Sequence, residues 1–125
     1  MMRILLVEDN LKFVKLIHYF IEEENDQFQI THAHNLQEAL HFLENQEFDV
    51  VVLDMYLPDS QGIQSINRLK EKKMNRPIVF LTSLDDPDIR NEAFRNGAGG
   101  YLLKDQIVNH FIPTLRNAIQ SSQSS

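Results

Sequence analysis

The stretch Val50-Val-Val-Leu-Asp-Met-Tyr-Leu-Pro-Asp-Ser-Gln-Gly62 decides how this chain folds. Its first four residues are apolar and three of them are β-branched, which predicts a strand buried on both faces of a sheet. The strand ends on the carboxylate of Asp54, and the residues from Pro58 to Gly62 predict a turn that leads into a helix. Ligands bind at the carboxyl ends of strands in a parallel sheet, so Asp54 lies at the expected functional edge. Since a single Asp could equally cap a loop, the interpretation depends on how the other strands end.

Length and composition predict one soluble domain. The chain has 125 residues, of which 42% are apolar and 24% charged, and we assign residues 1–120 to the domain and 121–125 to a polar tail or the start of a linker. It has no long apolar run, no leader and no cysteine, so we expect a cytoplasmic protein without a membrane span or disulfides. The net charge of −6 gives no electrostatic footprint for direct nucleic-acid binding by this segment.

Apolar runs and helical patterns alternate five times along the chain. The predicted strands are Met2–Val7, Phe28–Ala33 (a more polar edge strand), Phe48–Leu53, Pro77–Leu81 and Gly99–Leu103. Five helices are predicted between and after these strands. The first follows Asn10, with the apolar face Leu11, Val14, Ile17 and Ile21, and the second follows Asn35, with the apolar face Leu36, Ala39, Leu40 and Leu43. The third runs from Ile63 to Lys70–Lys73, the fourth from Asp86-Pro87 to Gly97, and the fifth over Val108–Gln120, with a late start or a bend at Pro113. Since crossovers are right-handed, this alternation predicts an α/β fold with a five-stranded parallel sheet covered by helices on both faces.

Four of the predicted strands end in charged or hydroxyl-bearing residues. The end residues are Glu8-Asp9 (first strand), Asp54 (third), Thr82-Ser83 (fourth) and Lys104 (fifth). If these strands are neighbours, three carboxylates converge, and each pair 4 Å apart repels by about 4 kcal/mol at an effective dielectric constant near 20. Such a cluster raises a pKa or recruits a cation, and hard oxygen ligands with room for water suit Mg²⁺. Lys104 and the Thr82 hydroxyl would lie opposite the carboxylates and supply hydrogen-bond donors. Together these side chains and the cation could bind a phosphoryl group, which Asp54 could accept as an acyl phosphate.

Over essentially its whole length the chain resembles a receiver domain of the response-regulator family, the phosphoacceptor module of two-component signalling, of the kind found in chemotaxis response regulators. The resemblance lies in Leu-Val-Glu8-Asp9-Asn, in Val-Leu-Asp54-Met-Tyr-Leu-Pro58 with Gly62, in Leu-Thr82-Ser83, and in Gly97-Ala98 followed by Tyr101-Leu-Leu-Lys104. It implies a flavodoxin-like (βα)5 fold with strand order 2-1-3-4-5. It also implies a signalling domain that takes a phosphoryl group from a histidine kinase or phosphotransfer protein, and not a multiple-turnover enzyme.

The resemblance also implies roles for individual residues. Asp54 would be the phosphorylation site, and Mg²⁺ (or Mn²⁺) would be bound by Asp54, by Asp9 directly, by Glu8 through water and by the backbone carbonyl of Tyr56. Phosphoryl oxygens would be contacted by Lys104, the Thr82 hydroxyl and the Ser83 amide. Thr82 and Tyr101 would form a switch pair that controls a face made by the fourth helix, fifth strand and fifth helix, where a partner, an output domain or a second copy would bind.

Two features depart from the family pattern or vary within it. Asp105 replaces the proline that usually follows the lysine, often after a cis bond; a cis bond before a non-proline residue costs roughly 2.5–4 kcal/mol, and Asp105 could compete for Lys104. Tyr56 and Leu84 occupy the variable positions that flank the site, and we expect them to tune the lifetime of the phosphoryl group.

Three other classes of protein share parts of this pattern. A haloacid-dehalogenase-like phosphatase needs a second Asp where Tyr56 stands. A flavodoxin-like cofactor binder needs a phosphate-cradling loop where Glu8-Asp9 would repel phosphate. A receiver-like docking module that is never phosphorylated remains an alternative interpretation, since a complete site can be retained for structural reasons. The histidines have no ligand spacing on a helix and are interpreted as solvated surface residues: His18, His32, His34, His41 and His110.

Overall fold

A computed structural model describes residues 1–23, 27–72 and 74–123 of the chain. Some predictions concern positions outside the described residues. These positions are Lys73, at the end of the predicted third helix, and Ser124 and Ser125, in the predicted tail. The main strands are β1 (Met2–Val7), β2 (Phe28–Ala33), β3 (Val50–Asp54), β6 (Ile78–Thr82) and β7 (Gly100–Leu103). The helices are α1 (Leu11–Glu22), α2 (Leu36–Asn45), α3 (Ile63–Glu71), α4 (Pro87–Arg95), the 3₁₀ turn η1 (Lys104–Gln106) and α5 (Ile107–Gln123). Two short strands, β4 (Tyr56–Leu57) and β5 (Ser60–Gln61), pair with each other.

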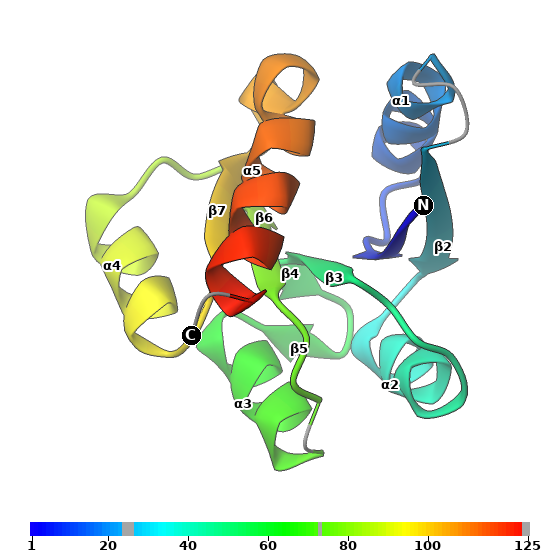
Figure 1. Cartoon of the computed structure of the whole chain (residues 1–125). Helices are drawn as coiled ribbons and strands as arrows, with labels where there is room; N and C mark the ends of the chain where they lie inside the picture. Colours follow the sequence, from blue (N-terminus) through cyan, green and yellow to red (C-terminus); the bar gives the residue numbers. More distant parts are fainter. Residues whose placement is uncertain (24–26, 73, 124–125) are drawn as a thin grey trace.

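The five main strands form one parallel sheet in the order β2-β1-β3-β6-β7. This is the predicted order 2-1-3-4-5, since β6 and β7 are the fourth and fifth main strands once the β4–β5 pair is set aside. The predicted α/β fold is therefore confirmed, with β3 at the centre of the sheet and β2 at one edge (Figure 1).

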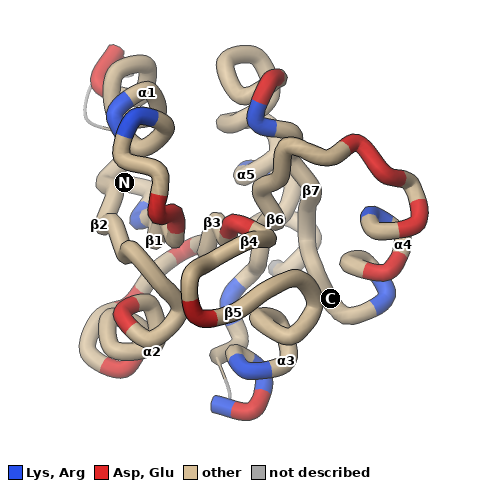
Figure 2. The backbone as a smooth tube through the Cα atoms, turned by 180° about the vertical axis from the view of Figure 1, so that it is seen from behind, with Lys and Arg blue, Asp and Glu red and all other residues tan. Residues whose placement is uncertain are grey.

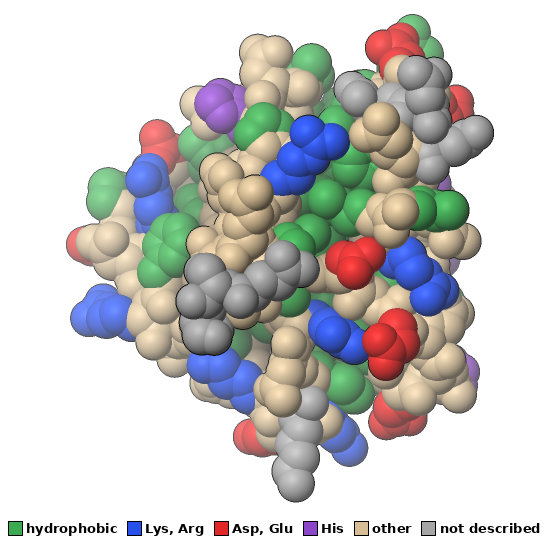
Figure 3. Space-filling model, in the orientation of Figure 1, with side chains coloured by type: hydrophobic (Ala, Val, Ile, Leu, Met, Phe, Trp, Pro, Cys, Tyr) green, Lys and Arg blue, Asp and Glu red, His purple; other side chains and the backbone are tan. Residues whose placement is uncertain are grey.

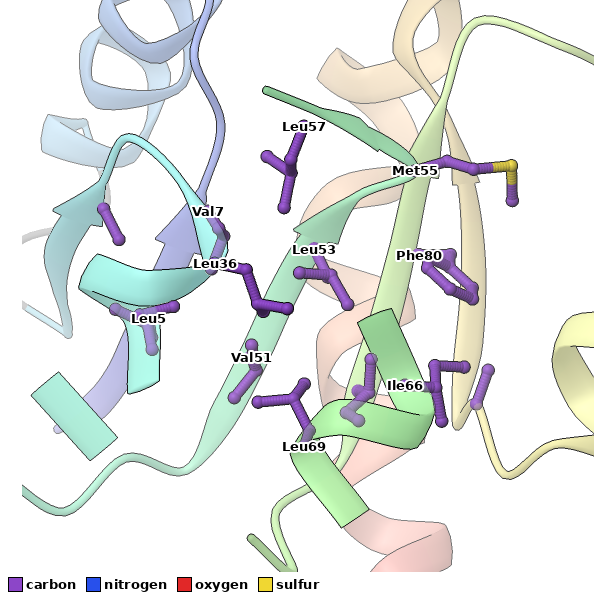
Figure 4. Close-up of a cluster of buried hydrophobic side chains, with 14 of the residues drawn as sticks. Leu5, Val7, Leu36, Val51, Leu53, Met55, Leu57, Ile66, Leu69 and Phe80 are labelled. Carbon is purple, nitrogen blue, oxygen red and sulfur yellow. The ribbon is translucent and has the colours of Figure 1, made fainter. Parts of the chain in front are cut away.

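Helices cover both faces of the sheet, and each face has its own apolar core. Side chains alternate along β3, so Val51 and Leu53 face one core and Val50 and Val52 the other, and all of them are buried. The first core is closed by α2, α3 and α4, and Figure 4 shows Leu36, Ile66 and Leu69 directed at the strand side chains. The second core is closed by α1 and α5 through the buried residues Val14, Ile17, Ile21, Ile107, Phe111, Leu115 and Ala118.

The helix starts follow the predicted capping chemistry. The side chain of Asn10 accepts hydrogen bonds from the amides of Lys12 and Phe13, and that of Asn35 accepts one from the amide of Glu38. At the start of α4 the carboxylate of Asp86 accepts from two amides, with Pro87 at the first helical position. These caps begin α1, α2 and α4 shortly after β1, β2 and β6 end, and so keep the loops at the functional edge short.

Three local predictions need correction. Leu11 does not belong to the buried face of α1, because it is the first residue of the helix and is 55% exposed, whereas Phe13 packs against the core. The late start considered for the last helix is wrong, since α5 begins at Ile107 and contains Pro113. That helix also runs through Gln123, three residues beyond the predicted end at Gln120, because no Gly or Pro follows Gln120.

The bond between Lys104 and Asp105 is trans, as are all peptide bonds of the described residues. None of the helices in these residues has the length and apolar character needed to cross a bilayer. On the face shown in Figure 3, basic and acidic side chains are interspersed.

Candidate functional site

The register of the parallel strands brings the polar strand ends together at one edge of the sheet. Val7 of β1 pairs with Leu53 of β3, so the residues that follow them, Glu8 and Asp54, are neighbours. In the same way Asp54 pairs with Leu81 of β6, next to Thr82. Thr82 in turn pairs with Leu103 of β7, immediately before Lys104. Buried apolar strands thus fix the positions of the acidic, hydroxyl and ammonium groups.

The three carboxylates form a compact cluster. Glu8, Asp9 and Asp54 each offer an oxygen, and these oxygens lie within 4.8 Å of one another. Glu8 is fully buried and Asp54 is 4% exposed, whereas Asp9 is exposed. In Figure 2 the acidic segments at the ends of β1 and β3 lie side by side. The cluster is therefore a buried carboxylate pair with an opening to solvent at Asp9.

The ammonium group of Lys104 lies against this cluster. Its Nζ is 2.5 Å from Oε1 of Glu8 and 3.4 Å from Oδ2 of Asp54. Burial, together with the neighbouring Asp54 carboxylate, raises the pKa of Glu8 to about 7, although Lys104 acts in the opposite direction. Burial alone would lower the pKa of Lys104, but its contacts with Glu8 and Asp54 outweigh that effect and raise it. Three carboxyl groups thus lie around one ammonium group at this edge of the sheet.

The residues present fit a small divalent cation. Hard cations take carboxylate oxygens, and Mg²⁺ keeps several waters, for which the exposed Asp9 leaves room. Oε2 of Glu8 accepts hydrogen bonds from the amides of Asp9 and Asn10, at 3.0 and 3.4 Å. Oε1 lies 2.5 Å from the ammonium of Lys104, which is its partner in the described part of the chain. A carboxylate oxygen has two lone pairs, so it can accept a further ligand beside the ammonium.

A second polar group links Thr82 to Tyr101. Thr82 is fully buried, and its hydroxyl oxygen accepts a hydrogen bond of 3.2 Å from the amide of Leu84. The carbonyl of Leu84 accepts one of 2.9 Å from the Tyr101 hydroxyl. Burial, and secondarily the nearby Asp86 carboxylate, raises the pKa of Tyr101. The backbone of Leu84 thus connects the two residues that the sequence predicts to be a switch pair.

The remaining predicted site residues lie around the cluster. The amide of Tyr56 donates a hydrogen bond of 3.3 Å to Oδ1 of Asp54, while the Tyr56 side chain is 47% exposed. Ser83 is exposed at the end of β6. Asp105 is exposed and makes no ion pair in the described part of the chain, so the competition for Lys104 considered above is absent there.

Sequence reasoning missed three residues that contact this edge. The ring centroid of Phe13 is 5.0 Å from Nζ of Lys104. Nε2 of His32 lies 2.6 Å from the carbonyl oxygen of Glu8, so this histidine is a half-buried neighbour of the site and not the solvated surface residue that was predicted. The carboxylate of Asp59, in the loop after Asp54, accepts hydrogen bonds from the amides of Leu36 and Gln37 at the start of α2. Each contact joins residues distant in sequence and leaves no local pattern.

Comparison with known proteins identifies the family. Residues 4–116 match the family model of the response regulator receiver domain. The transcriptional regulatory protein YdfI of Bacillus subtilis is 32% identical over 123 residues, which is 98% of this chain and 57% of that protein. The receiver domain of the Francisella response regulator 1452 superposes with a TM-score of 0.86 at 24% identity, over 98% of this chain and 99% of that one. A response regulator from Burkholderia pseudomallei, with a phosphorylated aspartic acid, calcium ion and citrate, superposes with a TM-score of 0.79 at 23% identity, over 99% and 72%.

The chain spans about half the length of the curated relatives it matches. The match to the family model nevertheless covers the main strands, apart from Met2 and Arg3 of β1, and all the strand-end residues described above. This chain belongs to the response regulator receiver domain family and is the receiver domain of a two-component response regulator.

Proposed function

We propose that Asp54 accepts a phosphoryl group from the phosphohistidine of a histidine kinase or phosphotransfer protein. A carboxylate oxygen of Asp54 attacks phosphorus, the bond between phosphorus and the imidazole nitrogen breaks, and the imidazole leaves as an acyl phosphate forms. The observation that carries this proposal is the position of Lys104, whose ammonium contacts both Asp54 and Glu8 at the edge of the sheet. The Burkholderia protein, a relative with the same fold, contains a phosphorylated aspartic acid and a calcium ion.

The carboxylates would hold Mg²⁺ (or Mn²⁺). Glu8, Asp9 and Asp54 supply oxygens within reach of one ion, and the backbone carbonyl of Tyr56 is the proposed fourth protein ligand. A bound divalent cation supplies positive charge to the phosphoryl oxygens. The exposed Asp9 and buried Glu8 fit the proposed difference in their roles, direct contact for Asp9 and contact through water for Glu8.

Lys104, Thr82 and Ser83 are the proposed contacts of the phosphoryl oxygens. The ammonium of Lys104 forms an ion pair with Asp54, and the raised pKa of Lys104 keeps this ammonium protonated at neutral pH. The Thr82 hydroxyl, which accepts from the Leu84 amide, has its own proton available to donate. The Ser83 amide lies next to it along the chain, at the carboxyl end of β6.

The connection through Leu84 supports a switch. If the Thr82 hydroxyl turns to the phosphoryl group, its bond with the Leu84 amide changes, and the Leu84 carbonyl that holds Tyr101 moves with it. Tyr101 lines a pocket between α4, β7 and α5 together with Arg90, Phe94 and His110. We therefore propose this face as the surface that controls an output domain, a partner or a second copy. The domain limits of 1–120, the cytoplasmic location and the absence of multiple turnover belong to the same proposal.

Small phosphodonors test the proposal directly. Acetyl phosphate or phosphoramidate with Mg²⁺ should add one phosphoryl mass to the wild-type protein, as measured by intact mass spectrometry, and none to Asp54→Asn or in the presence of EDTA. Asp105→Asn is the matched control, because Asp105 is an exposed carboxylate beside Lys104 that makes no ion pair in the described residues; it should be phosphorylated like the wild type. Modification of both wild type and Asp54→Asn, or of neither, contradicts the proposal, and the second result favours the docking module that is never phosphorylated.

A further inference from the structure

The ammonium group of Lys104 has an uncharged third neighbour. Besides the carboxylates of Glu8 and Asp54, the ring centroid of Phe13 lies 5.0 Å from Nζ. Phe13 belongs to the first turn of α1 and is half-buried against the second core, so its ring is held in place by packing. A cation at this distance from the face of an aromatic ring is attracted by the ring quadrupole.

The three neighbours of Lys104 respond differently to a divalent cation. A divalent cation bound directly to Asp54 and through water to Glu8 would attract the negative charge of both carboxylates, and the cation itself would repel the ammonium. Lys104 has a flexible four-carbon stem and is 21% exposed, so it could then turn to solvent. The attraction to Phe13 does not depend on those carboxylates and therefore persists in the metal-bound state.

We propose that Phe13 is a positioning residue for Lys104, and that its ring keeps the ammonium at the acidic edge when Glu8 and Asp54 are engaged by a divalent cation. The inference rests on the proposed function, in which Lys104 must meet a phosphoryl oxygen in that state. Phe13 would thereby raise the rate of phosphorylation without touching the phosphoryl group or the cation.

Kinetics form the first test. With saturating Mg²⁺, Phe13→Leu should be phosphorylated by acetyl phosphate roughly three- to tenfold more slowly than the wild type, which corresponds to about 0.6 to 1.4 kcal/mol at 1.36 kcal/mol per tenfold. Phe13→Tyr keeps a ring and should restore the wild-type rate. Phe20→Leu is the matched control, since Phe20 is a half-buried aromatic residue of the same helix and core that packs on Phe111; its rate should equal that of the wild type.

NMR gives a readout that does not depend on activity. In protein labelled at lysine, the ε-methylene protons of Lys104 should be displaced upfield by the Phe13 ring, and the displacement should persist when Mg²⁺ is added. It should vanish in Phe13→Leu and in Phe13→Met, the second variant to use if the first does not fold.

The outcomes separate the two proposals. A wild-type protein that is phosphorylated at Asp54, together with an equally fast Phe13→Leu, overturns the role of Phe13 alone. Loss of the upfield displacement on adding Mg²⁺ overturns it as well. A wild-type protein that is not phosphorylated at all contradicts the proposed function, while the NMR measurement still decides whether Phe13 holds Lys104.

Discussion

Glu8 makes the stability of the fold depend on pH near neutrality. This carboxyl group is fully buried, and burial together with the Asp54 carboxylate raises its pKa to about 7 from an ordinary value of 4.5. The folded state therefore binds the proton more tightly than the unfolded state, and the stability gained is fully present below pH 4.5 and is lost as pH rises through 7.

Without divalent cations, we expect the unfolding free energy of the wild type to fall across this range, relative to Glu8→Gln, by at most about 3 kcal/mol. Urea denaturation of both proteins in EDTA at several pH values measures the difference. Parallel pH profiles for the two proteins would show that Glu8 does not carry a raised pKa.

At the residue scale, the sequence predicts the charged groups of the site but not their uncharged neighbours. Glu8, Asp54 and Lys104 were predictable because each follows a buried strand, and strand order alone brings them together. Phe13 was not, because a half-buried aromatic residue in a helix looks the same in sequence whether it meets a methyl group or an ammonium. His32 was misjudged for a similar reason, since its partner is a backbone carbonyl, which no side-chain pattern reveals.

At the scale of elements, helices and main strands follow from local patterns, whereas short pairings do not. The turn from Pro58 to Gly62 was predicted, but the β4–β5 pair that flanks Pro58 and Asp59 is too short for any periodicity to show. The start of α2 was predicted from Asn35, yet two of these three capping hydrogen bonds are accepted by Asp59, 22 to 23 residues further along the chain. Long-range caps of this kind depend on the fold itself.

The cap from Asp59 gives a prediction about α2. Its carboxylate accepts from the amides of Leu36 and Gln37, at 2.9 and 3.0 Å, so it satisfies two helix-start donors and ties the loop after Asp54 to α2. Asp59→Ala should lower the unfolding free energy by about 1–2 kcal/mol. Asn35→Ala removes the one bond to the Glu38 amide and should cost about 1 kcal/mol or less. Chemical denaturation measures both, and an Asp59→Ala protein as stable as the wild type would show that water replaces the carboxylate without loss.

At the scale of the whole molecule, folding and metal binding are linked. The carboxylates that would bind the cation come from the ends of β1 and β3, which meet only in the folded sheet, so a cation that binds there stabilises the fold as a unit. At a Mg²⁺ concentration one hundred times the dissociation constant, the expected gain in unfolding free energy is about 2.7 kcal/mol, and EDTA should reverse it. Thermal unfolding with increasing Mg²⁺ measures the gain.

Asp9→Asn is the informative variant, because Asp9 is exposed and its loss leaves the buried pair of Glu8 and Asp54 in place. Its stability without metal should match that of the wild type, whereas its Mg²⁺-dependent gain should be much smaller. An equal gain in both proteins would place the stabilising cation elsewhere on the surface.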